Sequence, residues 1–239
     1  MAHPAADYVQ RGRGSIGSVT LEDLTRHKER RAEDRAALDR LLDETLVATL
    51  ATVSDDGRPW VVPMLLARDG ERLLLHGSTG AGALRQVGAG AEAVVCAYAV
   101  DGLVLASSMF EHSANYRSAV VRGPLVRLTG DEAWAALDAV SDGLLPGRRE
   151  EVRPMLDKEV AATVALALDL TDDNWILKVR SGGIGEDPAD VPDGMWTGVV
   201  PLHTVAGPPE PTPGAGDALP VPRSVTALQD RFSAPWPPC

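Results

Sequence analysis

The sequence predicts an α+β protein that is mainly β, in which antiparallel strands form a closed or partly closed barrel and helices lie at its rim. Three observations support this prediction. Short apolar runs separated by turn residues recur between residues 45 and 180. Only a few segments have the periodicity of a helix. The 239 residues are 44% hydrophobic, which is enough for a sizeable core.

The first helix is expected over residues 20–43, with Thr20 and then Asp34 as possible N-caps. The apolar pattern then changes to that of short strands, and Asp101–Gly102 is typical of a turn between two of them. Two more helices are expected, a short one that begins in STGAGALRQV and one over residues 131–145. The expected strands are 45–53, 58–67, 72–77, 92–100, 103–107, 117–130, 162–170 and 174–180.

Composition divides the chain into four parts. Twelve of the 18 prolines lie between residues 188 and 238, so long helices or strands are not expected there. The run MWTGVVPLHTVAG within this region is apolar enough to dock onto another surface. The parts are an N-terminal arm (1–19), the barrel domain (20–185), a docking segment (186–207) and a proline-rich tail (208–239).

Composition and motifs also exclude several classes of function. A net charge of −11 does not favour binding to a nucleic-acid backbone, and no run approaches the roughly 18 apolar residues that cross a bilayer. Two cysteines, and a start without the apolar stretch of a secretory signal, predict a reducing, cytoplasmic location. The five histidines form no close pair and no G-x-S-x-G motif is present, so neither a metal site nor a hydrolase is predicted.

The stretch LLLHGSTGAGALR could form an anion site. His76 ends a strand, Ser78 and Thr79 follow in a glycine-rich turn, and Arg85 lies in the helix that the turn opens. Free N–H groups at a helix start, hydroxyl groups and a guanidinium together suit a phosphate. The glycine spacing matches neither the dinucleotide fingerprint nor the Walker A loop, and an ordinary capped helix is the alternative.

Two further stretches are unusual for a sheet. In RPWVVPMLLA, Pro63 removes a ladder donor, so it lies at an edge, at a bulge or beside a ligand. In SSMFEHSANYRSAVVRG, the side chains of His112, Asn115, Tyr116 and Arg117 cannot all be buried without partners. Such a cluster lies at a subunit interface, lines the pocket of a polar ligand, or belongs to a solvated loop.

Taken together, the mid-strand proline, LLLHGSTGAGALRQV, DGLVLASSMFEHSANYRSAVVRG and MWTGVVPL resemble the FMN-binding split-barrel superfamily. Within it, the chain resembles the pyridoxamine 5'-phosphate oxidase-related flavoproteins, which include the nitroimidazole-resistance proteins. The resemblance implies an antiparallel split β-barrel. It also implies a homodimer with two FMN sites in the interface, each built by both chains.

The resemblance implies roles for single residues as well. The strand that carries Pro63 would lie along the flavin ring, the turn after His76 would hold the phosphate, and Trp196 would approach the flavin from the partner chain. The Arg117–Ser118 pair resembles an Arg-Gln pair that contacts FMN in the oxidases. The residues thus placed near FMN are Trp60, Val61, Val62, Pro63, Met64, His76, Gly77, Ser78, Thr79, Arg85, Arg117, Ser118 and Trp196.

The function implied is an FMN-dependent oxidoreductase that passes electrons from a reduced nicotinamide to a small acceptor such as a nitro-aromatic or a quinone. His76 and His112 are the candidate catalytic residues, because they are the nearby groups that can exchange protons near neutral pH. The oxidases' R-L-H-x-R ending has no counterpart in GVVPLHTVAG, so vitamin B6 is not the expected substrate. The alternative is a non-enzymatic flavin- or haem-binding sensor or carrier, with His76 or His112 as an axial haem ligand.

Overall fold

The computed structural model describes residues 27–80, 84, 87–214 and 219–233. The possible cap at Thr20 and most of the short helix expected after Thr79 lie outside these residues. The helices are η1 (Lys28–Arg30), α1 (Arg35–Glu44), α3 (Gly130–Leu144), η2 (Arg148–Glu151), α4 (Asp157–Ala161), η3 (Pro188–Asp190) and α5 (Arg223–Arg231). The strands are β1 (Arg31–Ala32), β2 (Val47–Val53), β3 (Pro59–Asp69), β4 (Arg72–Ser78), β5 (Ala89–Leu105), β6 (Ser113–Leu128), β7 (Thr163–Asp169), β8 (Trp175–Arg180) and β9 (Gly198–Pro201).

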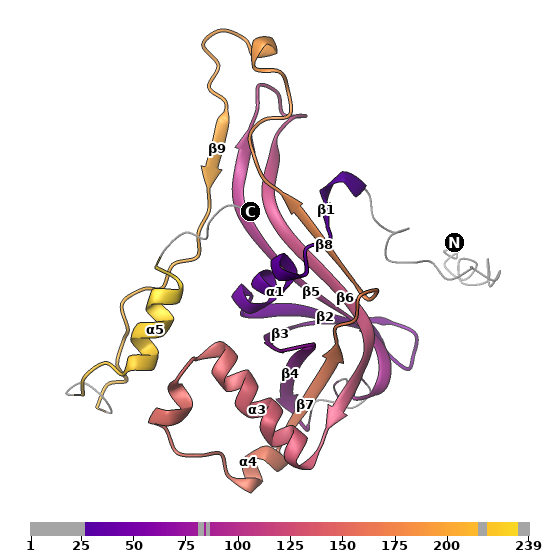
Figure 1. Ribbon diagram of the computed structural model, residues 1–239, viewed down its shortest axis with the longest axis vertical. Helices are drawn as coiled ribbons and strands as arrows, with labels where there is room; N and C mark the ends of the chain where they lie inside the picture. The colour runs from indigo at the N-terminus through magenta and orange to yellow at the C-terminus, as the bar shows by residue number, and fades with distance from the viewer. Residues whose placement is uncertain (1–26, 81–83, 85–86, 215–218, 234–239) are drawn as a thin grey trace, which may run out of the picture.

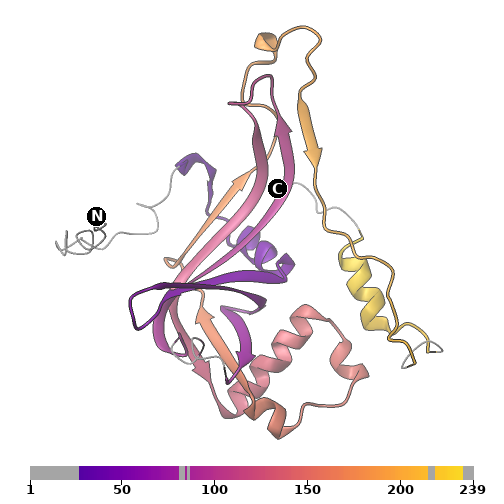
Figure 2. The same cartoon turned by 180° about the vertical axis from the view of Figure 1, so that it is seen from behind.

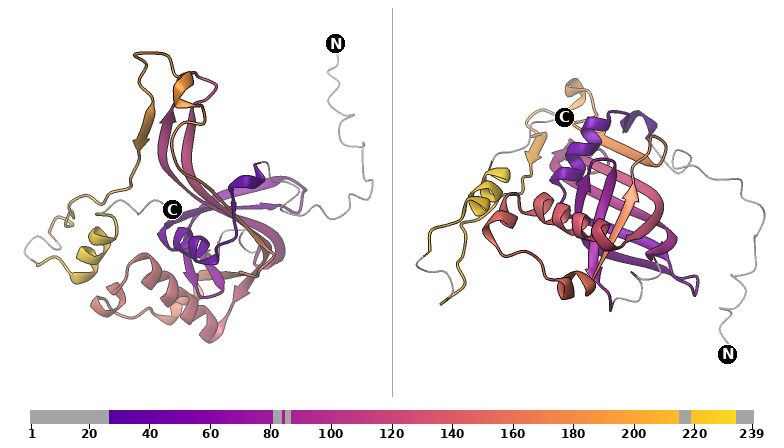
Figure 3. Two further views of the ribbon diagram at one scale, coloured as in Figure 1. Left: turned by 45° about the horizontal axis from the view of Figure 1, so that its top comes forward. Right: turned by 60° about the horizontal axis from the view of Figure 1, so that its bottom comes forward.

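Six antiparallel strands close into a ring in the order β2–β3–β4–β7–β6–β5 and back to β2 (Figure 3). The predicted antiparallel fold with helices at the rim is confirmed. Leucines and valines of the strands fill the ring, and Leu38, Leu41 and Leu42 of α1 join the same cluster. On the outside, α3 buries its apolar face against Ala67, Leu74 and neighbouring strand residues. The core therefore has two layers, one inside the ring and one beneath α3.

The ring is split between β3 and β4. The two strands pair only from Leu66 opposite Leu75 to Asp69 opposite Arg72. Beyond that point β3 continues to pair with β2 alone, and β4 continues to pair with β7 alone. The part of β3 over residues 59–65 therefore has an edge with no strand partner among the described residues.

A long hairpin of β5 and β6 rises out of the ring, and we call its residues 98–117 the arm (Figures 1 and 2). Strand β8 pairs with β6 along the base of the arm, and β9 pairs with β5 further out. The turn predicted at Asp101–Gly102 is wrong, because β5 passes through it with only a shift of register after Val100. Gly102 is needed for close packing instead: a Cβ there would lie 3.0 Å from the Val200 carbonyl oxygen of β9. The chain turns at the tip, and β6 begins at Ser113, earlier than predicted.

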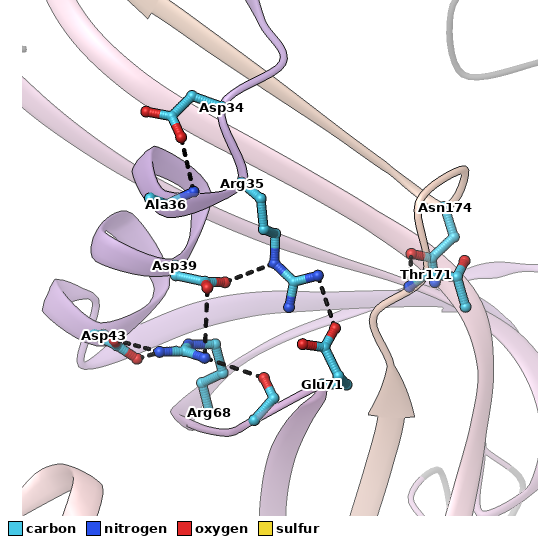
Figure 4. A network of polar contacts seen from close by, with 10 residues as sticks. Asp34, Arg35, Ala36, Asp39, Asp43, Arg68, Glu71, Thr171 and Asn174 are labelled. Carbon is cyan, nitrogen blue, oxygen red and sulfur yellow. Dashed lines mark hydrogen bonds and ion pairs between the residues drawn. The ribbon is translucent and has the colours of Figure 1, made fainter.

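Helix α1 is fixed over one end of the ring by ion pairs (Figure 4). Asp34 caps the helix by accepting from the Ala36 N–H at 2.9 Å, as predicted for the second of the two possible caps. Arg35 contacts Asp39 at 2.8 Å and Glu71 at 2.7 Å, the latter in the β3–β4 turn. Arg68 of β3 holds Asp43 at 2.6 Å, near the end of the helix. These contacts define where Glu44, the last residue of α1, lies.

The proline-rich tail contains a helix that the sequence did not predict. α5 begins after Pro222, whose fixed φ suits the start of a helix. The Ser224 N–H and hydroxyl both donate to Glu151, at 3.1 and 2.5 Å, and Arg231 donates to the Gly143 carbonyl at 2.9 Å. The tail therefore returns to the body of the protein beside α3. None of the helices over the described residues combines the length and the apolar character needed to span a membrane.

Candidate functional site

The first group of candidate residues lies at the split, where the C-terminal end of β4 leaves β3. His76 is half-buried, and its Nδ1 atom is buried with no hydrogen-bond partner. Burial lowers the pKa of His76 below its ordinary value, so the ring is neutral at pH 7. An unpaired buried nitrogen is unusual in a folded protein and fits a position beside a bound molecule.

Gly77 lets the two sides of the split approach each other. A Cβ on Gly77 would lie 3.8 Å from the Met64 methyl carbon of β3. It would also lie only 2.3 Å from Cδ1 of Leu84, a buried residue of the segment that follows β4. A side chain at position 77 would therefore fit only if the end of the Leu84 side chain moved. The contacts of Met64 and Gly77 with a flavin stay predictions.

The predicted flavin-lining residues of β3 alternate between two faces. Trp60 and Val62 pack against the core, and Met64 is buried in it. Val61 and Pro63 are exposed on the outer face. A ligand at the split would therefore meet the unpaired backbone edge of β3 rather than a continuous row of its side chains. Pro63 lies on this edge strand, which is where a missing N–H costs least.

The predicted phosphate-binding residues are only partly described. The Ser78 hydroxyl accepts from the Gly80 N–H at 3.2 Å, which leaves its own hydrogen free to donate to a ligand. The Thr79 hydroxyl instead donates to the Ala162 carbonyl oxygen at 3.2 Å. Arg85 lies outside the described residues. Ser78 therefore has the freer hydroxyl of the two, and the role of Arg85 stays a prediction.

A second candidate site lies at the base of the arm and is separate from the split. It is a cavity of about 820 Å³, which we call the arm cavity. Its walls come from the junction of α1 and β2, the arm strands β5 and β6, the end of β8, β9 with the segment after it, and Phe232 after α5. Its lining includes Arg117, but none of residues 60–64 or 76–79.

A group of three charged residues, two of them buried, forms one wall of the arm cavity. Arg117 contacts Asp101 through two nitrogens, at 3.0 and 2.7 Å, and donates to Glu44 through a third. The side chains of Arg117 and Glu44 are 10% and 8% exposed, and that of Asp101 is 37% exposed. The bonds to Asp101 raise the pKa of Arg117, whereas burial raises the pKa of Glu44 despite its pairing with Arg117. The second oxygen of Glu44 is buried without a partner.

Asn115 and Arg180 form a second polar part of the wall. The Arg180 guanidinium donates to Asn115 Oδ1 at 2.6 Å and to the Gly183 carbonyl oxygen at 3.2 Å. Asn115 in turn donates to the Gly182 carbonyl oxygen at 3.0 Å. His203, after β9, lines the same cavity. The polar cluster of the sequence thus finds many of its partners within its own chain.

The remaining predicted residues lie apart from both sites. His112, near the arm tip, accepts from the Ala106 N–H through Nδ1 at 3.0 Å. Ser118 lies on β6 between Tyr98 and Lys178, and its side chain points away from the barrel core. Trp196 precedes β9, is 66% exposed and packs over Gly198. Their contacts with a flavin stay predictions.

Three residues of the arm cavity were not identified from the sequence. Glu44 ends a helix whose charged residues look like an ordinary solvated face. Asp101 was assigned to a turn with Gly102, and for this reason it was not considered as a site residue. Arg180 ends a strand and carries no motif. Only the polar stretch around Arg117 indicated a site in the sequence. It did not indicate which residues form ion pairs or hydrogen bonds with Arg117.

Comparison with known proteins identifies relatives of this chain. The family model described as pyridoxamine 5'-phosphate oxidase matches residues 34–174. The structure of an FAD- and haem-binding protein from Mycobacterium smegmatis is 42% identical in sequence, with a TM-score of 0.80, over 84% of this chain and 97% of that one. Comparison with curated proteins gives no match.

Two more distant structures share the fold. A flavocytochrome from Azotobacter vinelandii is 28% identical, with a TM-score of 0.77, over 85% of this chain and 94% of that one. A putative 5-nitroimidazole antibiotic resistance protein from Bacteroides thetaiotaomicron is 19% identical, with a TM-score of 0.52, over 62% of this chain and 86% of that one. The similarity to the Bacteroides protein shows the fold alone. The Mycobacterium and Azotobacter proteins match this chain over a larger share of its length.

Proposed function

Because the chain belongs to the pyridoxamine 5'-phosphate oxidase family, we propose that it is a flavin-dependent oxidoreductase. It passes electrons from a reduced nicotinamide to a small acceptor such as a nitro-aromatic or a quinone. The observation that carries this proposal is the split, where a buried unpaired nitrogen of His76 and an unpaired edge of β3 lie where the resemblance requires a flavin. The resemblance implied FMN, but the 42% identical relative is described as binding FAD, and FAD is the form we propose.

The residues at the split would hold this cofactor in defined ways. The Ser78 hydroxyl and the Arg85 guanidinium would bind phosphate, and the β3 edge would meet the ring through its backbone. The flavin, when bound, supplies two-electron transfer, so no side chain has to carry that chemistry. His76, kept neutral by burial, can accept a hydrogen bond or a proton at Nδ1. His112 accepts the Ala106 N–H through Nδ1 within the arm tip, so Nε2 is the nitrogen that it could offer to a ligand.

The test begins with the absorption spectrum of the purified protein and with chromatography of the cofactor released by heat. We expect flavin absorption bands and an FAD peak. Anaerobic stopped-flow with a reduced nicotinamide should then bleach the flavin, and adding a nitro-aromatic or quinone acceptor should restore its colour. Absence of any bound flavin, or a flavin that no nicotinamide reduces, would refute the oxidoreductase proposal.

The proposal includes a homodimer whose flavin sites are shared between the two chains. It is supported by an exposed apolar outer face on β2 and β3, where Val53, Val61 and Leu65 are 58%, 60% and 43% exposed. Coexpression of an Arg85→Ala chain with a Trp196→Ala chain tests it. If one site takes Arg85 from one chain and Trp196 from the other, the hybrid dimer has one intact site and one with both defects. If each chain builds its own site, no site is intact, and flavin content stays as low as in the single variants.

A second candidate function is that of a flavoprotein that also binds haem, as a sensor or an electron carrier. The observation that favours it is the similarity to two proteins described as an FAD- and haem-binding protein and a flavocytochrome, each matched over more than nine-tenths of its own length. The structure offers a cavity, apart from the split, that is large enough for a cofactor. Addition of hemin to the purified protein should give a shifted Soret band, and no change would refute this function.

A further inference from the structure

The arm cavity has the size and wall chemistry of a small-molecule site. Its volume of about 820 Å³ lies within the range of roughly 300–1,000 Å³ typical of ligand pockets. Apolar side chains from different elements form much of the wall, among them Leu46, Val100, Val179, Val199 and Phe232. A site of this kind suits a large, mainly apolar molecule that carries a few polar groups.

Arg180 supplies a positive charge that the cavity does not neutralise. Its guanidinium donates only to the neutral oxygens of Asn115 and Gly183, and over the described residues no carboxylate lies within ion-pair distance of it. Arg117, on the same wall, is paired with two carboxylates. A half-buried arginine without an acid partner is well placed to bind the carboxylate of a ligand.

Glu44 contributes an oxygen to this wall that has no hydrogen-bond partner among the described residues. Its side chain is 8% exposed, it lines the cavity, and one of its oxygens is buried with no hydrogen-bond partner. Buried polar atoms in folded proteins are nearly always paired, and each exception needs an explanation. A molecule bound in the cavity provides one.

His203 gives the cavity a metal-ligating nitrogen. It follows β9 on the cavity wall, and its ring is otherwise exposed to solvent. A neutral imidazole nitrogen is a common protein ligand of haem iron. His76 lies at the split, and His112 uses Nδ1 to hold the arm tip, so neither faces this cavity.

From these observations we infer that the arm cavity is a haem site, with His203 as the iron ligand and Arg180 as the partner of a propionate. Val100, Val179 and Phe232 would form the apolar surface for the macrocycle. This assignment rests on the haem-binding candidate function above and gives it a location and residues. Much of the far wall belongs to residues 179–204 and 232, beyond the segment 34–174 that matches the family model. The haem site is therefore built partly by residues outside the matched segment, and it is distinct from the split.

Hemin titration of purified protein, followed through the Soret band and through flavin content on the same sample, tests the assignment. Arg180→Gln should weaken hemin binding by about tenfold or more, as expected for loss of a charge-assisted contact. His203→Gly should remove the spectrum of the imidazole-bound form, and added imidazole should restore it. His112→Ala is the matched control, because it removes a histidine outside the cavity, and it should bind hemin as the wild type does. Val100→Trp should block hemin by filling the cavity and leave flavin content unchanged.

Each outcome decides a different point. If wild-type protein binds no hemin, the haem function and the cavity assignment both fail, whatever the flavin content. If hemin binds but the His203, Arg180 and Val100 variants behave like wild type, the cavity assignment alone is wrong. Loss of hemin binding in His112→Ala would likewise overturn the choice of ligand. If hemin binding follows the expected pattern in protein that contains no flavin, the cavity assignment stands and the oxidoreductase proposal fails.

Discussion

Replacing Arg117 with methionine should destabilise the protein strongly, because it leaves a carboxylate buried without a partner. Arg117 is the only cation within ion-pair distance of Glu44 over the part of the chain that the structure describes, and the other Glu44 oxygen is already unpaired. Breaking a buried ion pair by removing one partner costs about 3–5 kcal/mol. Asp101, at 37% exposure, can turn to water and adds little to this cost. We therefore expect most of the loss to come from Glu44.

The pH dependence and a double variant separate this explanation from a simple loss of packing. Burial already raises the pKa of Glu44, and loss of Arg117 raises it further. A carboxyl whose folded pKa is raised favours the folded state while it is protonated and loses that contribution as pH rises. Arg117→Met should thus be less destabilising at pH 5 than at pH 7.5. Glu44→Leu combined with Arg117→Met should recover most of the stability, since an apolar replacement of a buried pair is often neutral.

Urea unfolding followed by circular dichroism measures both effects. A loss below about 1 kcal/mol for Arg117→Met, the range of an exposed pair, would refute the reasoning. So would a double variant that is less stable than the single one. The stable double variant also tests the flavin contact that the resemblance assigned to Arg117. Normal flavin content would mean that Arg117 acts only within its own chain, and loss of flavin would support the contact.

Three further predictions concern the split and the outer face. Arg85→Ala should lower flavin affinity by about tenfold to a hundredfold, because a charge-assisted phosphate contact contributes roughly 1.5–3 kcal/mol. Ser78→Ala should lower flavin affinity less. Fluorescence titration with flavin measures both effects. Burial lowers the pKa of His76, so the unfolded chain binds the His76 proton more readily than the folded chain does. The free energy of unfolding of the wild type should therefore fall as pH drops below about 6.5, and it should fall more than that of His76→Gln. Urea unfolding of both proteins at pH 7.5 and 5.5 measures this, and equal falls would contradict the prediction. Val61→Asp should convert the proposed dimer to monomers, which light scattering detects. Asp55→Asn on the exposed β2–β3 turn serves as a control and should leave the proposed dimer intact.

Much of the barrel could be predicted from the sequence, because its signals are local. Alternating apolar residues and turn residues located β2, β3, β4, β7 and β8 to within a few residues. The error at Asp101–Gly102 has a physical cause. An Asp-Gly pair favours a tight turn on its own, but here the aspartate is held by Arg117 and the glycine is buried under β9. Contacts with residues distant in the sequence outweighed the local preference.

The candidate site could be predicted only where a motif marks it. The HGST turn was identified because glycine, hydroxyl groups and an arginine follow a strand within a few residues. The arm cavity could not be identified in this way, since Glu44, Arg117 and Arg180 come from segments far apart in the sequence and meet only when the ring and the arm have formed. Helix α5 was missed for a related reason. Its stability depends on Glu151 and on carbonyl groups near α3, which no local pattern reveals.

The two proposed sites lie in different parts of the fold. The arm points away from the end of the molecule where α3 and α4 lie, and the end of β4 lies toward that end (Figures 1 and 2). A flavin at the split that also met Trp196 would have to take Trp196 from a second chain, which is the arrangement we propose. The arm cavity needs no such help, because α1, β5, β6, β8, β9 and Phe232 of one chain already surround it. On this geometry, a variant that separates the subunits of the proposed dimer should weaken flavin binding and leave ligand binding in the arm cavity unchanged.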